Sequence, residues 1–427
     1  MLTVSEALAA IRGTVVRGPI LSLPLDEALG LILAEVVVSG VDSPPFDKAL
    51  MDGYAVRFAD LTGHRKGTTH EIELTVIEEV TAGRVPGRSV GPGQATRIMT
   101  GAPLPAGADV VIPVEDTDFH PFTTSMGDIP SDLGQVRLRD VQQCRPGRFI
   151  LRQGAAVKQG AEILKPGRML RAQEIAALAE LGFTHVRVTS RPRVGILATG
   201  DELVPAGTKP GPGQIQNSNE PMLAAQIQQA GAGPIRLGIA RDEREHLRQR
   251  ILQGLDCDFL LLSGGVSAGK LDLVPSELAA AGVRQVFHKI QMRPGKPLWF
   301  GILEPHSGGN PERTVPCYVF GLPGNPVSSM VCCELFVRAA LRVWSGIEPE
   351  ILAPISARLE ADHHNDGNRP TYHPAKIAWT ADGPTVSVVD WIGSSDLCAT
   401  VDANCTVLFP AGDRLWCAGA RLEVFPW

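Results

Sequence analysis

Hydrophobic positions near the start of the chain recur at helical spacing. Thr3, with Glu6 three residues later, forms a capping-box pattern, and the apolar residues Leu8 and Ile11 follow. A second apolar stripe at helical spacing predicts a helix over about Asp26–Leu33. The chain is therefore expected to begin with two short helices.

Beyond residue 38 the pattern changes to short strands between Gly and Pro. In residues 39–140 the β-branched runs predict a small β domain, with strands at Glu71–Glu78, Thr96–Met99 and Val110–Val114. Residues Phe119–Leu133 are expected to form a long hairpin loop in it. Further short strands are predicted at Phe149–Leu151 and Ala161–Leu164, and then a helix over Ala172–Leu181, ended by Gly182.

From residue 194 onward, strands and helices alternate. The predicted strands are Val194–Ala198, Ile235–Ile239, Phe259–Leu262 and Tyr318–Phe320. The predicted helices start at Asn219 as N-cap with Pro221 in the first turn, at Glu243, and at Asn325-Pro326, the last running to about Val343. This alternation indicates a doubly wound α/β sheet. The final segment, 351–427, again reads as strands and turns.

Composition narrows the class of protein. The chain has 427 residues, 45 Gly, 34 Pro and a formal charge of −6, which argues against a general nucleic-acid binder because that function needs a basic field. No apolar run approaches the roughly 18 residues that span a bilayer, and the first residues lack a signal-peptide pattern. The eight cysteines are scattered without a C-x-x-C pair, which favours a reduced, cytoplasmic location.

Loops at the predicted carboxyl ends of the strands are the first candidates for a ligand site, because open α/β sheets bind ligands there. In one loop, Gly264 and Gly265 would let backbone N–H groups converge on an anion, and Ser267 adds a hydroxyl. Asp272 follows, where a cation bridging a phosphate would need a carboxylate. A tight turn that closes the strand is the alternative.

Two more loops carry candidate chemistry. Lys289, Arg293 and Lys296 place three cations within eight residues, which suits an oxyanion, although a solvated charged turn explains them as well. Asn325 and Pro326 fit either a purely structural helix cap or a ligand loop at a helix N-terminus.

The predicted β domain holds two acids in apolar surroundings. Asp47 and Asp52 could each cap a turn or act as a catalytic carboxylate. Periodicity does not separate these roles.

Seven segments occur in an order that resembles one family. They are Pro45–Asp47, Met51–Ala55, Met99–Pro103, Thr199–Leu203, Ser263–Ser267, Pro294–Pro297 and Gly321–Ser328. Together they resemble the molybdopterin molybdenumtransferases, which are related to the E domain of gephyrin. The resemblance covers nearly the whole chain.

The resemblance implies an elongated homodimer with four domains per chain. The expected domains are a linker domain (20–38 and 141–168), a β-rich domain (39–140), a molybdopterin-binding-like α/β domain (1–19 and 169–346) and a C-terminal β domain (347–427). The α/β domain of one chain would face the β domain of the other across the active-site cleft.

The implied reaction takes adenylylated molybdopterin and molybdate with Mg²⁺, releases AMP, and leaves molybdenum on the dithiolene sulfurs. It makes the upstream adenylyltransferase a candidate partner. The implied catalytic residues are Asp52, Thr100, Glu202, Asp272, Lys289 and Lys296, and Asp52, Glu202 and Asp272 are also the implied metal ligands. The implied binding residues are Ser263, Gly264, Gly265, Ser267, Arg293, Pro297, Pro323, Gly324, Asn325, Pro326 and Ser394.

Several positions depart from the family pattern. Ala155 and Ala156 replace two acids, Asn217 replaces an Asp, and Arg293 replaces a Lys. In an Arg-x-x-aromatic-x-Arg pattern that begins at Arg369, Pro374 replaces the second Arg.

Two hypotheses follow from these departures. The enzyme works with fewer ligands, since Mg²⁺ often uses one or two carboxylates plus substrate phosphates. Alternatively, the chain is a catalytically weakened paralogue that binds a pterin or nucleotide, or acts as a scaffold. A third role would be that of an anchoring protein like gephyrin, but nothing in the sequence marks a peptide-binding groove.

Overall fold

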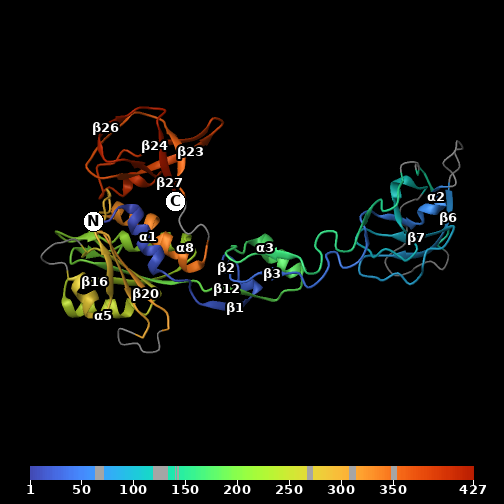
Figure 1. Cartoon of the computed structure of the whole chain (residues 1–427), viewed down its shortest axis with the longest axis horizontal. Helices are drawn as coiled ribbons and strands as arrows, with labels where there is room; N and C mark the ends of the chain where they lie inside the picture. The colour runs from blue at the N-terminus through green and yellow to red at the C-terminus, as the bar shows by residue number, and fades with distance from the viewer. Residues whose placement is uncertain are drawn as a thin grey trace. The chain divides into compact units, whose positions relative to one another are not determined.

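A computed structural model describes residues 1–62, 72–118, 133–139, 141, 144–266, 273–306, 314–347 and 353–427. The chain divides into two compact units. The first unit comprises Met1–Glu35, Lys165–Ala179 and Phe183–Trp427, and the second comprises Val36–Leu164 and Glu180–Gly182. The second unit is therefore an insertion in the sequence of the first (Figure 1).

The second unit is built on a five-stranded sheet in the order β8-β5-β7-β6-β9. The strands are β5 (Gly53–Val56), β6 (Ile72–Val80), β7 (Gln94–Ile98), β8 (Val110–Pro113) and β9 (Gln135–Leu138). Two short pairs accompany it: β4 (Lys48–Ala49) with β10 (Ile150–Leu151), and β3 (Val37–Val38) with β11 (Glu162–Leu164). The helix α2 (Phe58–Thr62) places Leu61 in the core beside Tyr54 and Val56.

This unit confirms the strands predicted in the β-rich region, within a few residues at each end. The predicted hairpin loop over Phe119–Leu133 lies outside the described residues, apart from Leu133. The division of the whole chain into four domains stays a prediction.

The main sheet of the first unit has six strands in the order β16-β13-β17-β20-β19-β18. They are β13 (Arg193–Thr199), β16 (Gly233–Ala240), β17 (Phe259–Ser263), β18 (Arg284–His288), β19 (Trp299–Leu303) and β20 (Cys317–Leu322). The four strands from β16 to β20 pair in parallel, and β19 and β18 continue the sheet antiparallel. This agrees with the α/β alternation predicted from the sequence.

Helices cover both faces of this sheet. One apolar cluster joins the sheet to α1 (Val4–Thr14), α4 (Asn219–Gln229), α7 (Pro326–Cys332) and α8 (Arg338–Ser345), and a π-helical turn over Cys333–Val337 links the last two. The other cluster joins it to α5 (Arg244–Gly254) and α6 (Val274–Ala280). The capping box predicted at Thr3 and Glu6 is present at the start of α1.

A three-stranded sheet, β1-β12-β2, belongs to the same unit. It contains β1 (Ile20–Pro24), β2 (Ile32–Leu33) and β12 (His185–Thr189). The helix predicted over Asp26–Leu33 is therefore wrong: Leu25–Glu27 forms a single 3-10 turn, Gly30 adopts φ 76°, and Ile32 and Leu33 pair with β12. Pairing with a strand about 150 residues away buries these apolar positions, which local periodicity assigned to a helix face.

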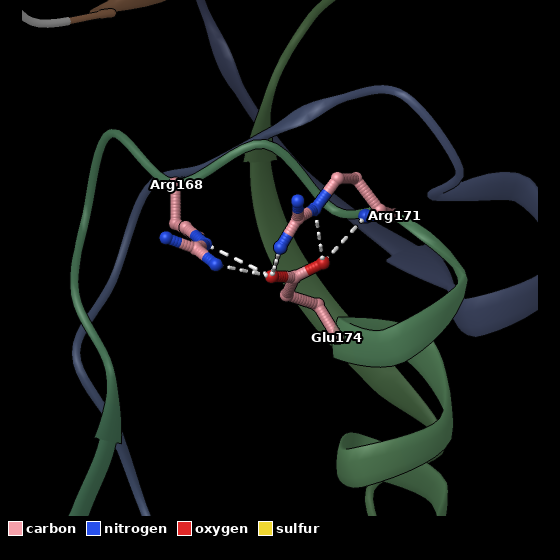
Figure 2. Close-up of polar contacts among 3 residues, drawn as sticks. All are labelled: Arg168, Arg171 and Glu174. Atoms are coloured by element: carbon pink, nitrogen blue, oxygen red, sulfur yellow. Dashed lines mark hydrogen bonds and ion pairs between the residues drawn. The ribbon is translucent and has the colours of Figure 1, made fainter.

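A buried carboxylate fixes the start of the neighbouring helix α3 (Ala172–Glu180), shown in Figure 2. Glu174 is 4% exposed and accepts hydrogen bonds from the guanidinium groups of Arg168 and Arg171, and from the backbone N–H of Arg171. The side-chain hydrogen bond from Arg171, with those from Arg168, holds the pKa of Glu174 well below its usual range. The carboxylate is therefore ionised wherever the protein is folded near neutral pH.

The C-terminal segment forms a closed barrel in the order β21-β24-β23-β25-β27. Its strands are β21 (Ile355–Leu359), β23 (Thr371–Thr380), β24 (Gly383–Val388), β25 (Cys405–Phe409) and β27 (Arg421–Pro426), and a separate pair joins β22 (His363–Gly367) to β26 (Gly412–Trp416). Tyr372, Phe425 and Trp427 pack into the same apolar cluster as α1, so the barrel is attached to the helical face (Figure 1). No helix in the described ranges is long and apolar enough to cross a membrane.

Candidate functional site

The topology of the six-stranded sheet reverses at its carboxyl edge, between β13 and β17, and we call this switch point the crevice because doubly wound sheets bind ligands there. The chain runs from β13 through α4 to the edge strand β16, and then returns through α5 to β17 on the other side of β13. The connections thus leave β13 and β17 in opposite directions. Ligands of doubly wound sheets bind at such a switch point, which here lies between the loops after Thr199 and Ser263.

Two glycines are required where these loops meet. Gly264 and Gly265 have φ values of 96° and 65°. A Cβ added at Gly264 would lie 2.7 Å from the carbonyl oxygen of Thr199, and one at Gly265 would lie 3.0 Å from its hydroxyl. Only glycine fits this close approach without strain. The Gly264 N–H donates to the Leu322 carbonyl oxygen, so the predicted convergence of both glycine N–H groups on an anion is not present, and anion binding by this loop stays a prediction.

Asn219 joins two of the strand-end loops. Its side-chain nitrogen donates to the Ser263 hydroxyl and to the Gly324 carbonyl oxygen, each over 2.7 Å. Within the described residues, its side-chain oxygen is buried and has no hydrogen-bond partner. The prediction of Asn219 as the N-cap of α4 is wrong: Ser218 occupies that position and Asn219 is the first helical residue.

This bridging role had no signal in the sequence beyond the position of Asn219 at a helix start. Both of its partners lie more than 40 residues away. The packing of α4 against β13, β16 and α7 brings them together. Pro221 does lie in the first turn, as predicted.

Glu202 lies at the same edge of the sheet, in the loop after β13. Its carboxylate folds over Gly200, so that a Cβ at Gly200 would lie 2.3 Å from a carboxylate oxygen. Gly200 has φ 143°, and Glu202 is exposed. The carboxylate is thus accessible beside the crevice.

The cation loop 293–297 packs between α7 and the C-terminal barrel. Gly295 sits against Cys332 of α7, and the Arg293 backbone exchanges hydrogen bonds with Pro370 and Tyr372. The Arg293 guanidinium pairs with Asp366 at 3.2 Å. Lys296 is exposed, while Lys289 and Pro297 are half-buried. The loop is held by its backbone and presents its cations outward.

The barrel also contacts the start of α7. Asn325 is the N-cap, as predicted, and Pro326 is the first helical residue, but the Asn325 side chain makes no capping hydrogen bond. It donates instead to the Ser394 hydroxyl over 2.8 Å, and Val327 N–H donates to the Ser394 carbonyl oxygen. Pro323 is buried and its carbonyl oxygen accepts from the Ser329 hydroxyl. The structure thus assigns Asn325 to a contact between the α/β part and the barrel.

In the second unit, Asp52 and Thr100 meet directly. One carboxylate oxygen of Asp52 accepts from the Thr100 backbone N–H at 2.7 Å and from its hydroxyl at 2.8 Å. These two hydrogen bonds lower the pKa of Asp52. Both residues are exposed, so the ionised Asp52 carboxylate faces solvent. Both hydrogen bonds from Thr100 end on one of its oxygens.

Asp47 has a different environment. Its carboxylate accepts from the Gln153 backbone N–H at 2.8 Å and pairs with Arg152. The hydrogen bond from Gln153 is the main cause of its lowered pKa. Asp47 therefore joins the start of β4 to the segment after β10, so its role is structural.

The residues that depart from the family pattern differ in their burial and in their hydrogen bonds. Asn217 is 4% exposed; its amide nitrogen donates to the Glu220 carboxylate at 3.0 Å and its oxygen accepts from the Glu220 N–H. Pro374 is buried in β23, and Arg369 donates to the Met292 carbonyl oxygen at 2.9 Å, just before the cation loop. Ala155 and Ala156 are exposed in a turn of the second unit.

Two predicted site residues, Ser267 and Asp272, lie outside the described residues. Across the described part of the chain, no group of three His, Cys, Asp or Glu side chains is arranged to hold a metal ion. Of the predicted residues, Ser263, Gly264, Gly265 and Gly324 are brought together at the crevice, whereas Asp52 and Thr100 belong to the other unit.

Two protein-family models match nearly all of the chain that precedes the barrel. Residues 2–182 match the model described as "MoeA N-terminal region (domain I and II)". Residues 195–343 match the model described as "Probable molybdopterin binding domain".

Known proteins resemble the chain over most of their length. A Nostoc protein named molybdopterin molybdenumtransferase is 37% identical over 81% of this chain and 74% of its own. One of the same name from Staphylococcus aureus is 31% identical over 99% and 95%. The crystal structure of a molybdopterin biosynthesis MoeA protein from Pyrococcus horikosii superposes with a TM-score of 0.80 at 30% identity, covering 100% of this chain and 99% of that one.

Proposed function

Since the chain belongs to the molybdopterin molybdenumtransferase (MoeA) family, we propose that it transfers molybdenum from molybdate to adenylylated molybdopterin and releases AMP. Molybdenum insertion in molybdenum cofactor biosynthesis is the function of the family; the adenylylated form of the substrate is the finer part of the proposal. The observation that carries it is the crevice where Asn219 links the Ser263–Gly265 loop to Gly324.

The chemistry of the crevice suits a phosphate-bearing substrate. In the glycine loop at the end of β17, the Gly264 N–H donates to the Leu322 carbonyl oxygen, and the Gly265 N–H is the proposed donor to an anion. Lys296 and Arg293 are exposed and add positive charge, which favours an oxyanion such as molybdate. Ser394 and Asn325 border the same helix start. These groups would bind and orient the two anions and stabilise charge that develops on the phosphate oxygens.

Mg²⁺ is the expected cation. Glu202 is exposed at the crevice, and Asp52 stays ionised because Thr100 donates two hydrogen bonds to it. One or two carboxylates with substrate phosphates satisfy this ion, so Glu202, Asp52 and Asp272 are the proposed ligands. Mg²⁺ would neutralise phosphate charge during cleavage of the pyrophosphate linkage.

The proposed assembly is a homodimer in the cytoplasm. Asp52 and Thr100 belong to a different compact unit from Glu202 and Lys296, and a dimer would let the two sets come from different chains. The adenylyltransferase that supplies the substrate is the proposed partner. Sedimentation of the purified chain as a monomer at micromolar concentration would contradict the dimer.

The test is AMP release from adenylylated molybdopterin with molybdate and Mg²⁺. Lys296→Ala should lower the rate, whereas Lys376→Ala, which removes an exposed lysine of β23, should not. If the wild-type chain binds the substrate but releases no AMP, the weakened-paralogue hypothesis replaces this one.

A further inference from the structure

A cavity of about 370 Å³ opens at one end of the C-terminal barrel. Residues of β23 alternate, so His373 faces the same side as Ala375 and Ile377 of the barrel core. The apolar core of the barrel ends at His373. Beyond it, the cavity lies between β22, the start of β23 and the residues after β24. Ligands often bind in the mouths of barrels.

Aromatic rings form one wall of this cavity. The Trp391 ring lies 4.9 Å from the His373 ring, and the His363 ring lies 5.2 Å from it. His363 also stacks on Phe409 of the barrel core at 4.5 Å. The wall is thus held in place by its contact with Phe409 of the barrel core, and its rings can stack on a flat ring system.

Of the three histidines that line the cavity, His364 pairs with Asp413, and the two imidazoles of the aromatic wall, His363 and His373, are uncharged at neutral pH. Burial lowers the pKa of His373 to about 4 and also lowers the pKa of His363. The Nδ1 of His373 lies 2.8 Å from the Pro374 carbonyl oxygen, so in the neutral ring Nδ1–H donates there and Nε2 is left as an acceptor.

The polar groups of the cavity are mainly acceptors. Asn365, Thr371 and His373 are each no more than 5% exposed, so polar side chains are built into the wall. Three carboxylates line the cavity against one guanidinium, Arg293, which already pairs with Asp366. Within the described part of the chain, the Asp390 carboxylate makes no hydrogen bond or ion pair. This charge balance repels an oxyanion and attracts N–H donors.

We propose that this cavity binds the pterin ring of the substrate. One face of the ring would lie against the aromatic wall formed by Trp391, His373 and His363, and its N–H edge would lie at Asp390. The inference rests on the proposed function for the identity of the ligand. A pterin presents an amino group beside a ring N–H, and two adjacent donors match a carboxylate. Adenine, the other ring of the substrate, presents its amino group beside ring acceptors.

The position of Arg293 supports this assignment. It lines the cavity and also belongs to the cation loop with Lys296. A pterin held in the cavity would therefore direct its anionic side chain toward that loop. The cavity would supply specificity for the ring, and the loop would bind the charges.

The test is calorimetric titration of the full chain with 6-hydroxymethylpterin and, separately, with AMP, at pH 7. Asp390→Asn should weaken pterin binding about tenfold or more, since it removes a charged hydrogen-bond acceptor of the same size. Trp391→Ala should weaken it as well. The matched controls are Asp382→Asn and Trp379→Ala, which change exposed residues elsewhere on the barrel. Unchanged melting temperatures verify the fold of each variant.

Three results would overturn the inference: no pterin binding to the wild type, pterin binding lost in Lys296→Ala but retained in Asp390→Asn, or AMP binding that depends on Asp390. Pterin binding as expected without AMP release in the enzyme assay would contradict the proposed function alone.

Discussion

The side-chain nitrogen of Asn219 lies 2.7 Å from the hydroxyl oxygen of Ser263, so the first residue of α4 holds the end of β17. Because the same nitrogen also donates to Gly324, one amide sets the spacing of two strand-end loops. A hydroxyl that accepts from Asn219 keeps its own hydrogen for a ligand.

We expect Asn219→Ala to lower AMP release at least tenfold, because the two loops lose their common tether. Gln226 is the matched control. It lies seven residues on in α4, donates to Met330 and Glu334, and likewise has a buried side-chain oxygen without a partner among the described residues. Both alanine variants should lose about 1–3 kcal/mol of unfolding free energy, measured by urea titration. Equal losses of activity in the two would show that Asn219 serves stability only.

Asp52→Asn should reduce the rate of AMP release about a hundredfold while leaving the melting temperature nearly unchanged. The residue is exposed, so little packing is lost, but its ionised oxygens are removed from the proposed Mg²⁺. Asp47→Asn is the control, since Asp47 also accepts a backbone N–H in the same unit. We expect it to lower stability and spare the rate. The reverse pattern would exchange the roles of the two carboxylates.

Glu174 predicts a specific dependence of stability on pH. Its pKa in the folded protein is held below the unfolded value of about 4.3. The stabilisation is therefore complete above the unfolded pKa and is lost as the pH falls toward the folded one. Glu174→Gln should cost roughly 1.5–3 kcal/mol at pH 7 and progressively less below pH 4. Urea unfolding of both proteins at pH 7 and pH 3 tests this, and a difference independent of pH would refute it.

Asn217 offers a test of the missing acids. Asn217→Asp would place a carboxylate about 3 Å from that of Glu220, where the amide now donates. Two adjacent carboxylates repel unless a proton or cation lies between them. We expect the variant to be less stable than the wild type without Mg²⁺ and to gain more stability when Mg²⁺ is added.

Adding Ala156→Asp to Asn217→Asp should lower the Mg²⁺ concentration that gives half-maximal AMP release. Ala156 is exposed, so the substitution itself carries little cost in folding. An unchanged Mg²⁺ requirement would mean that these positions do not lie near the metal.

Strands and helices of the six-stranded sheet could be predicted from the sequence because their apolar runs and caps are local signals. The glycine loop was found for the same reason: Gly264 and Gly265 adjoin a buried strand. The helix predicted over Asp26–Leu33 failed because Ile32 and Leu33 satisfy their burial by pairing with Val188 and Thr189. The sequence predicts a cap at Asn219 and either a cap or a ligand loop at Asn325, yet both side chains reach partners far along the chain. Side-chain contacts between distant segments leave no periodic trace.

The insertion of residues Val36–Leu164 into the first unit has a consequence for biosynthesis. A ribosome completes this inserted unit while most of the six-stranded sheet is still untranslated. The helix α1, made first, packs near Trp344 and Tyr318, whose contacts reach Gly18 and Val16. The amino-terminal segment therefore lacks its contacts with Tyr318 and Trp344 until some 340 residues have been synthesised. A nascent chain stalled before β20 should leave α1 open to chaperones and proteases while the inserted unit is already protected.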